Sequence, residues 1–87
     1  MNYTMKYLIN MFEQAIESKA NMIVVELEID GYKDNEFVIT PANNFKNKLE
    51  FYKTTYDDNL CHKLNKRVKI YDISHHYNLN ELIDYIS

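Results

Sequence analysis

Residues 22–40 read MIVVELEIDGYKDNEFVIT, and this stretch decides the predicted fold. Over residues 23–29 the odd positions are apolar and most even positions are acidic, which is the period-two pattern of a half-buried strand. Residues 31–35 supply turn chemistry, and residues 36–40 return as a second strand. We therefore expect a β-hairpin whose odd-numbered face packs on helices, while its even-numbered face meets water or a partner.

Helical periodicity flanks this hairpin on both sides. Apolar residues at helical spacing predict a first helix over residues 5–18, with Thr4 placed to cap it. After the hairpin, Thr40 and Pro41 are typical of a helix start, because proline at the first helical position loses no hydrogen bond. Apolar side chains at helical spacing then predict a second helix that ends near Tyr56.

The C-terminal third of the chain predicts one or two further strands. Residues 60–64 are compatible with a short strand, and residues 67–73 show a stronger strand pattern. Regular alternation would place Ile70 and Ile73 on opposite faces of that strand.

A short terminal helix completes the order α-β-β-α-(β)-β-α. An apolar stripe over residues 79–86 predicts it, and Asn78 and Glu81 stand three apart as in a capping box. The simplest solution is a single α+β domain over residues 1–87. We expect a two-layer sandwich in which a small, mostly antiparallel sheet carries the helices on one face and leaves the other open.

Composition argues against catalysis. The 87 residues contain one glycine, one proline, one cysteine and no tryptophan. Phosphate loops, dinucleotide fingerprints and nucleophile elbows need glycine where the main chain approaches a ligand, so Gly31 alone cannot supply them. We therefore predict no enzyme activity and no cofactor. A single cysteine and the lack of a signal-peptide or membrane-span pattern indicate a cytoplasmic protein.

Acidic residues on the hairpin are the first candidate site. They either form the solvated face that antiparallel sheets commonly have, or a recognition surface for a basic partner. The candidate partner-binding residues are Glu26, Glu28, Asp30, Tyr32, Asp34 and Glu36.

A basic segment is the alternative site. Its candidate nucleic-acid-binding residues are His62, Lys63, Lys66, Arg67 and Lys69. Cations interleaved with aromatic side chains are typical of proteins that bind single-stranded nucleic acid. The same charges also suit an edge strand that is protected against aggregation. The formal net charge of −3 gives no general attraction to nucleic acid.

Metal-capable side chains occur in two adjacent pairs, Cys61 with His62 and His75 with His76. Neighbouring residues of a strand point to opposite faces, so Cys61 and His62 cannot bind one ion together. His75 and His76 are expected in a loop before the last helix, without the spacing that zinc ligands usually show. We therefore predict no metal site.

Small size, acidic balance, the lack of catalytic motifs and richness in Asn, Lys, Ile and Tyr together resemble the accessory proteins of phages and mobile elements. Among these the chain resembles the anti-CRISPR proteins, some of which occupy a nucleic-acid-binding groove with acidic side chains. The resemblance implies that the acidic hairpin residues, with Asp57 and Asp58 as a second patch, inhibit a host-defence nucleoprotein inside the host cell.

We therefore expect a non-enzymatic protein that binds a macromolecular partner. One alternative is a small nucleic-acid-binding regulator that uses residues 61–76. The other is a self-associating structural protein, which Met22, Val24 and Val38 on the nominally exposed face would favour.

Overall fold

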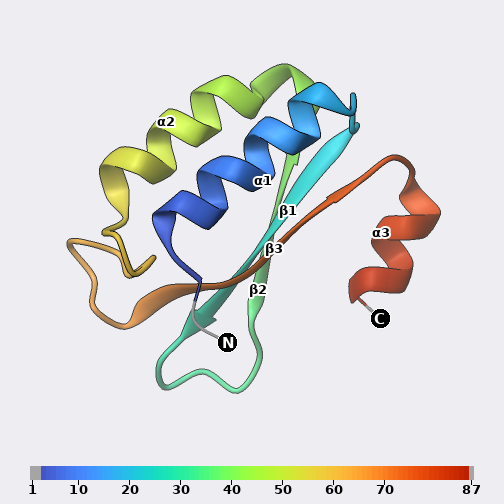
Figure 1. The fold of residues 1–87 in the computed structure, drawn as a ribbon. Helices are drawn as coiled ribbons and strands as arrows, with labels where there is room; N and C mark the ends of the chain where they lie inside the picture. The colour runs from blue at the N-terminus through green and yellow to red at the C-terminus, as the bar shows by residue number, and fades with distance from the viewer. Residues whose placement is uncertain (1–2, 87) are drawn as a thin grey trace.

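Three helices and a three-stranded antiparallel sheet make up the part of the chain, residues 3–86, that the computed structural model describes (Figure 1). The elements are α1 (Met5–Glu17), β1 (Met22–Ile29), β2 (Glu36–Pro41), the short 3-10 helix η1 (Ala42–Asn44), α2 (Phe45–Thr55), β3 (Val68–His76) and α3 (Leu79–Ile86). The strand order β2-β1-β3 places β1 at the centre. The predicted α+β class and antiparallel sheet are confirmed. The short strand expected over residues 60–64 is reduced to two isolated bridges, at Cys61 and His62.

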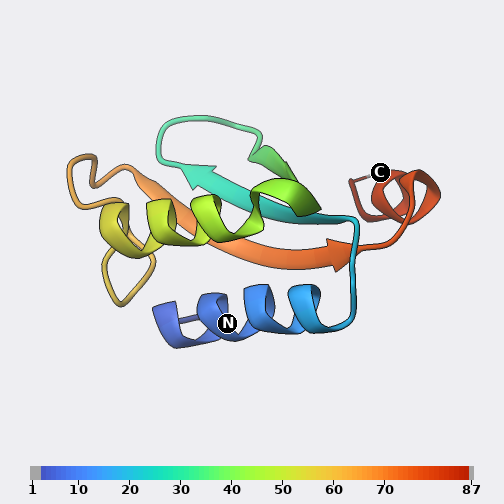
Figure 2. The same cartoon turned by 90° about the horizontal axis from the view of Figure 1, so that it is seen from above.

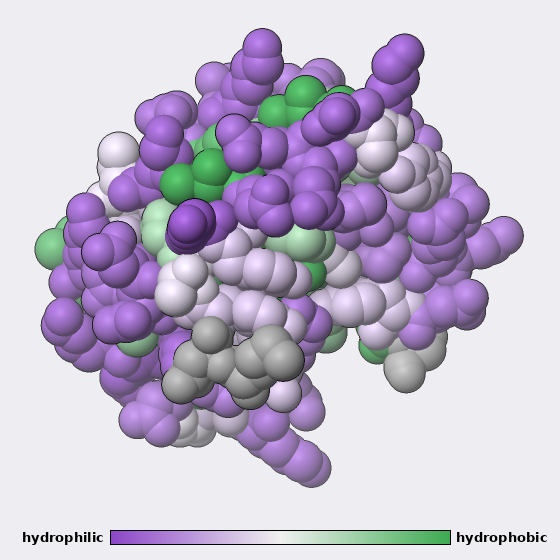
Figure 3. All heavy atoms as spheres, viewed as in Figure 1, coloured by the Kyte–Doolittle hydropathy of each residue, from purple (hydrophilic) through white to green (hydrophobic). Residues whose placement is uncertain are grey.

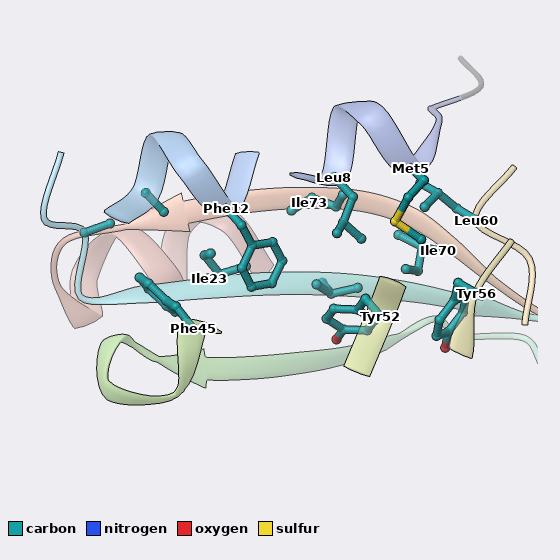
Figure 4. Packing of buried hydrophobic residues seen from close by; sticks show 13 residues of the cluster. Met5, Leu8, Phe12, Ile23, Phe45, Tyr52, Tyr56, Leu60, Ile70 and Ile73 are labelled. Atoms are coloured by element: carbon teal, nitrogen blue, oxygen red, sulfur yellow. The ribbon is translucent and has the colours of Figure 1, made fainter. Parts of the chain in front are cut away.

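The hydrophobic core lies between the sheet and the pair α1 and α2, as Figures 2 and 4 show. Phe12 of α1 stands edge-on to Phe45 and Tyr52 of α2, with ring centroids 6.2 and 6.0 Å apart. Each fully buried large apolar side chain contributes about 1.5–3 kcal/mol relative to an exposed one. The buried cluster consists of Met5, Leu8, Phe12, Ala15, Ala20, Ile23, Val25, Phe45, Tyr52, Tyr56, Leu60, Ile70 and Ile73.

A Schellman motif ends α1 and turns the chain toward β1. The Ala20 N–H donates to the Ala15 carbonyl at 2.9 Å, and the Lys19 N–H donates to the Ile16 carbonyl at 3.2 Å. Lys19 takes a φ of +60°, the left-handed conformation that glycine usually occupies in this motif. At the other end of α1, Thr4 occupies the cap position, but its side chain makes no capping hydrogen bond, contrary to expectation.

The register of β2 differs from the prediction by three residues, because a turn over residues 31–35 would place Glu36 opposite Asp30 and not opposite Leu27. Leu27 pairs with Glu36, so the even-numbered residues of β2 share the core face with the odd-numbered residues of β1. Phe37 and Ile39 therefore lie on the opposite face, where they are 38% and 49% exposed. The five-residue turn expected over residues 31–35 would have paired odd with odd. Since side chains alternate with period two, the different pairing moves every β2 side chain to the other face.

A β-bulge changes the alternation of β3. The register shifts opposite Glu26 and Leu27, which leaves Tyr71 as an extra residue in β3. As a result Ile70 and Ile73 are both buried in the core, although regular alternation predicted opposite faces.

Contrary to expectation, the helices do not share one face of the sheet. Tyr85 of α3 packs on Phe37 and His76, with ring centroids 6.1 and 5.1 Å apart, on the side away from the core cluster. Val24 is fully buried on this same side, and Leu82 of α3 is also buried. Figure 2 shows α3 at the end of the sheet where β3 finishes. The chain turns back there because this face also offers apolar side chains, so the predicted open face is partly covered.

The predicted capping box begins α3. The Glu81 N–H donates to Asn78 Oδ1 at 2.9 Å. In return the Glu81 carboxylate accepts from Asn78 Nδ2 at 3.1 Å and from the Tyr77 N–H at 3.2 Å. These bonds occupy donors at the helix start that would otherwise have no partner.

Candidate functional site

The hairpin does not present its acidic residues on one surface. Glu36 lies on the α2 side of the sheet because it pairs with Leu27, whereas Glu26 and Glu28 lie on the opposite side. Asp30, Tyr32 and Asp34 belong to the exposed loop that connects β1 and β2. The expectation of a single acidic face that includes Glu36 is therefore wrong, and the cause is the three-residue change of register, since a shift by an odd number of residues exchanges the two faces.

Glu26 is held beneath α3. Asn35 Nδ2 donates to its carboxylate at 2.7 Å, and the Tyr85 hydroxyl lies 3.5 Å from it. The same hydroxyl donates to Asp72 Oδ2 at 3.1 Å. Glu26 and Asp72 are cross-strand partners, and two like charges placed so would repel without these donors. Burial raises the pKa of the Tyr85 hydroxyl, and the charge of Asp72 adds to the effect.

Sequence reasoning missed Asp72 and Tyr85 as neighbours of Glu26. Nothing local in the sequence signals this cluster, because it depends on the β3 bulge and on the placement of α3. The cluster fastens α3 to the sheet, and Glu26 is therefore less available to a partner than its even-numbered position suggested.

His75 and His76 lie in β3 and not in the expected loop, because the strand extends three residues beyond the predicted end. His75 pairs with Ile23 and lies on the α1 side, so the two histidines face opposite sides of the sheet. Within residues 3–86, no three His, Cys, Asp or Glu side chains come close enough to hold a metal ion together.

His76 is buried beside α3, with its Nε2 2.8 Å from Ser74 Oγ. Burial lowers the pKa of His76 below its ordinary value, and the Glu81 carboxylate offsets this only in part. A serine–histidine contact also occurs in nucleophilic catalysis, where a third group orients the histidine ring. Here the ring lies against Tyr85, an arrangement that packs α3 on the sheet.

Arg67 links the hairpin loop to the basic segment. Its guanidinium donates to the Asp30 carbonyl from Nη2 at 2.8 Å and from Nε at 3.2 Å. The Asp30 N–H in turn donates to the Arg67 carbonyl at 2.8 Å. Gly31, at φ +91°, lies against the same side chain, and a Cβ there would stand 2.7 Å from Arg67 Nη2. These contacts give the hairpin loop a defined position.

His62 stabilises the turn before β3 through hydrogen bonds to the backbone. Its Nδ1 accepts hydrogen bonds from the N–H groups of Leu64 and Asn65, each at 3.1 Å. Its ring stands edge-on to Tyr56 with centroids 5.1 Å apart. Of the predicted nucleic-acid-binding residues, His62 is therefore engaged within the fold, whereas Lys63 is exposed.

Acidic and basic candidates meet in one shallow pocket of about 500 Å³. The hairpin contributes Glu28 and Asp30 to its lining, and the basic segment contributes Lys66, Arg67 and Lys69. Glu28 and Lys69 are also cross-strand partners. Since opposite charges stand close together here, neither set produces a field of one sign over a large surface.

The pair Asp57 and Asp58 shapes the turn after α2. The Asp57 carboxylate accepts hydrogen bonds from the N–H groups of Asn59 and Cys61 at 2.9 and 3.0 Å. The Cys61 bond is the main cause that lowers the pKa of Asp57. The Asp58 carbonyl accepts from the Met5 N–H at 3.0 Å at the start of α1. The suggested second acidic patch thus has a local structural use.

The sequence did not indicate a larger hollow of about 690 Å³ between the end of α1 and the start of α2. Lys19 and Lys46 stand at its rim, and Ala15 and Phe45 contribute apolar surface. Around it, the face that carries α1 and α2 is mostly hydrophilic, with small separated apolar areas (Figure 3).

Comparison with protein-family models, with curated proteins and with solved structures gives no match to this chain. Over residues 3–86, the helices lack the length and apolar character that a membrane span requires.

Proposed function

We propose that this protein is a non-enzymatic binding protein that occupies a macromolecular partner through the tip of its β1–β2 hairpin. The hairpin tip consists of Glu28, Asp30, Tyr32 and Asp34. The observation that carries the proposal is Tyr32, whose side chain is 65% exposed among three exposed carboxylates. Figure 1 shows the connecting loop extending beyond the body of the sheet.

The physical argument rests on the fixed position of this loop. Arg67 and Asp30 hold it through three hydrogen bonds, so less conformational entropy is lost when a partner binds. Tyrosine contributes large contact area with a polar end and is enriched at interfaces. Asp34 lies outside the pocket of mixed charge, so its carboxylate favours a basic group on the partner, since complementary charge speeds association and fixes orientation.

The finer proposal is that the partner is a host-defence nucleoprotein and that the protein acts as an inhibitor of the anti-CRISPR type in the host cytoplasm. The resemblance in size, acidic balance and composition supports it, together with acidic groups at an exposed tip. The nucleic-acid-binding alternative has less support, because Glu28 and Asp30 lie beside Lys66, Arg67 and Lys69.

Paired variants test the hairpin tip. The tip variant combines Tyr32→Ala with Asp34→Lys. The control variant combines Leu64→Ala with Glu13→Lys, so it also removes one large exposed side chain and reverses one exposed negative charge, but outside the tip. Each protein is used to capture partners from cells of the host, followed by quantitative mass spectrometry. We expect a partner that the wild type and the control capture equally and the tip variant loses. Equal capture by the tip variant would place the binding surface elsewhere.

A cell-based assay tests the finer proposal. Cells with an active CRISPR system are challenged with a targeted phage while they express the wild type, the tip variant or the control. We expect the wild type and the control to restore phage growth and the tip variant to fail. No restoration by the wild type would reject inhibition of that defence, while leaving the capture result to decide on the hairpin tip.

A further inference from the structure

The two edges of the sheet differ in how they are protected. On β3, the segment before the strand covers one end of the edge: Ile70 donates to the Leu60 carbonyl and His62 donates to the Val68 carbonyl, both at 2.9 Å. The bulge at Tyr71 interrupts the same strand. Over residues 3–86, β2 pairs with β1 alone, so its outer edge has no neighbouring strand.

The sequence of β2 also lacks the usual protection of an edge strand. Natural edges carry lysines, a proline within the strand or a bulge. Here the only charge is Glu36 at the first position, and the only proline is Pro41 at the last. Between them Phe37 and Ile39 expose apolar surface. Because no described strand pairs with its outer edge and because Phe37 and Ile39 are exposed, β2 is suited to pair with a further strand.

We infer that β2 pairs antiparallel with β2 of a second copy, about a two-fold axis at Val38, so that the two sheets join into one. In this register Phe37 stands opposite Ile39 of the other copy, and Glu36 stands opposite Thr40. Such a contact uses the same surface on both copies and therefore closes as a dimer. Aromatic and β-branched side chains placed opposite each other are a favourable cross-strand pair.

Charge favours a second copy as the occupant. The two Glu36 carboxylates lie at opposite ends of the paired strands, so no like charges oppose each other. Each Glu36 stands opposite Thr40, near the C-terminal end of the other copy's β2. From that end the other chain continues through η1 into α2. The first turn of that helix carries the exposed Lys46, a charge of the opposite sign.

This pairing replaces the surface that the sequence suggested for self-association. Val24 is fully buried, and Val38 lies half-buried on the core side of β2, so neither contributes an exposed apolar face. The inference does not depend on the proposed function, because the two hairpin tips would stay free at opposite ends of the joined sheet.

Sedimentation analysis over a concentration series tests the dimer. We expect the wild type to shift from monomer to dimer with concentration, and Ile39→Lys to weaken association about tenfold or more. Leu64→Lys is the matched control, since Leu64 is 92% exposed in a turn far from β2, and it should associate like the wild type. A wild type that stays monomeric to about 1 mM, or an Ile39→Lys variant that associates equally, would overturn the inference.

Oxidative cross-linking tests the register. With Cys61→Ser as background, Val38→Cys places one thiol at the two-fold axis. Directly opposed residues of antiparallel strands have Cα atoms about 4.5–5.5 Å apart, which a disulfide can span. We expect a disulfide-linked dimer for Val38→Cys and none for Tyr71→Cys on the other edge. If both variants cross-link equally, or only Tyr71→Cys does, the pairing of β2 with itself is wrong.

Discussion

Replacing Tyr52 with phenylalanine is expected to stabilise the fold. The Tyr52 side chain is only 2% exposed, and its ring packs against Phe12 and Tyr56 with centroids 6.0 and 5.7 Å away. Among the described residues its hydroxyl finds no hydrogen-bond partner. The ring therefore contributes to the core, while its oxygen has lost water without gaining a replacement.

The magnitude follows from the cost of that hydroxyl. A buried polar group without a partner lowers the free energy of unfolding by about 1–3 kcal/mol. Phenylalanine keeps the ring and removes only the oxygen, so little packing is lost. We expect the free energy of unfolding to rise by about 1 kcal/mol, which corresponds to roughly 4–8 °C in melting temperature for a domain of this size.

The matched control is Tyr85→Phe, which removes the same atom from a hydroxyl that donates to Asp72. Hydrogen bonds to charged groups contribute about 1.5–3 kcal/mol, and partial exposure reduces this, so we expect a loss of about 1 kcal/mol. Urea unfolding followed by circular dichroism measures both variants, with the slope of the transition unchanged. If Tyr52→Phe destabilised the protein as much as Tyr85→Phe, the reasoning would be refuted, because the Tyr52 hydroxyl would then have a partner.

Three further variants probe single local features. Lys19→Gly removes the strain of a left-handed residue and should raise the free energy of unfolding by about 1 kcal/mol, whereas Lys19→Ala should leave the urea midpoint nearly unchanged. Because burial holds the pKa of His76 below 6.5, its contribution to stability is present above that pH and is lost as the pH falls below it. His76→Asn should therefore flatten the change in melting temperature between neutral and acidic pH, and an unchanged slope would assign that loss to another group. Asp57→Asn should lower the urea midpoint at neutral pH, because backbone hydrogen bonds to that carboxylate lower its pKa below the ordinary value of 3.8. The variant should also lack part of the stability that the wild type loses as the pH falls below 3.8, and an unchanged acid transition would contradict this.

The local elements could be predicted from the sequence because their signals lie within a few residues. The helical spacing of residues 5–18 predicts α1, the alternation of residues 23–29 predicts β1, and the capping box at Asn78 and Glu81 predicts the start of α3. The signals for α1 and β1 depend on which neighbouring side chains share a face, and the signal for α3 depends on a hydrogen bond between residues three apart. These local signals do not depend on the rest of the fold.

The candidate site could be predicted only where it stays within one loop. Tyr32 and Asp34 are exposed in the loop, as their turn composition suggested, whereas Asp30 lies in the loop although it was expected on the strand. The placement of Glu26 and Glu36 on opposite faces of the sheet was not predictable. It depends on which residue of β1 each residue of β2 pairs with.

Only the tertiary structure decided the register of β2, the bulge at Tyr71 and the face on which α3 packs. The period-two pattern of a strand shows that its side chains alternate between two faces. It does not show which residues of two strands lie opposite each other. That choice is made by packing between distant segments, where a shift of one residue exchanges the buried and exposed sets. The same packing brings Tyr85 over Glu26 and Asp72, 59 and 13 residues away along the chain.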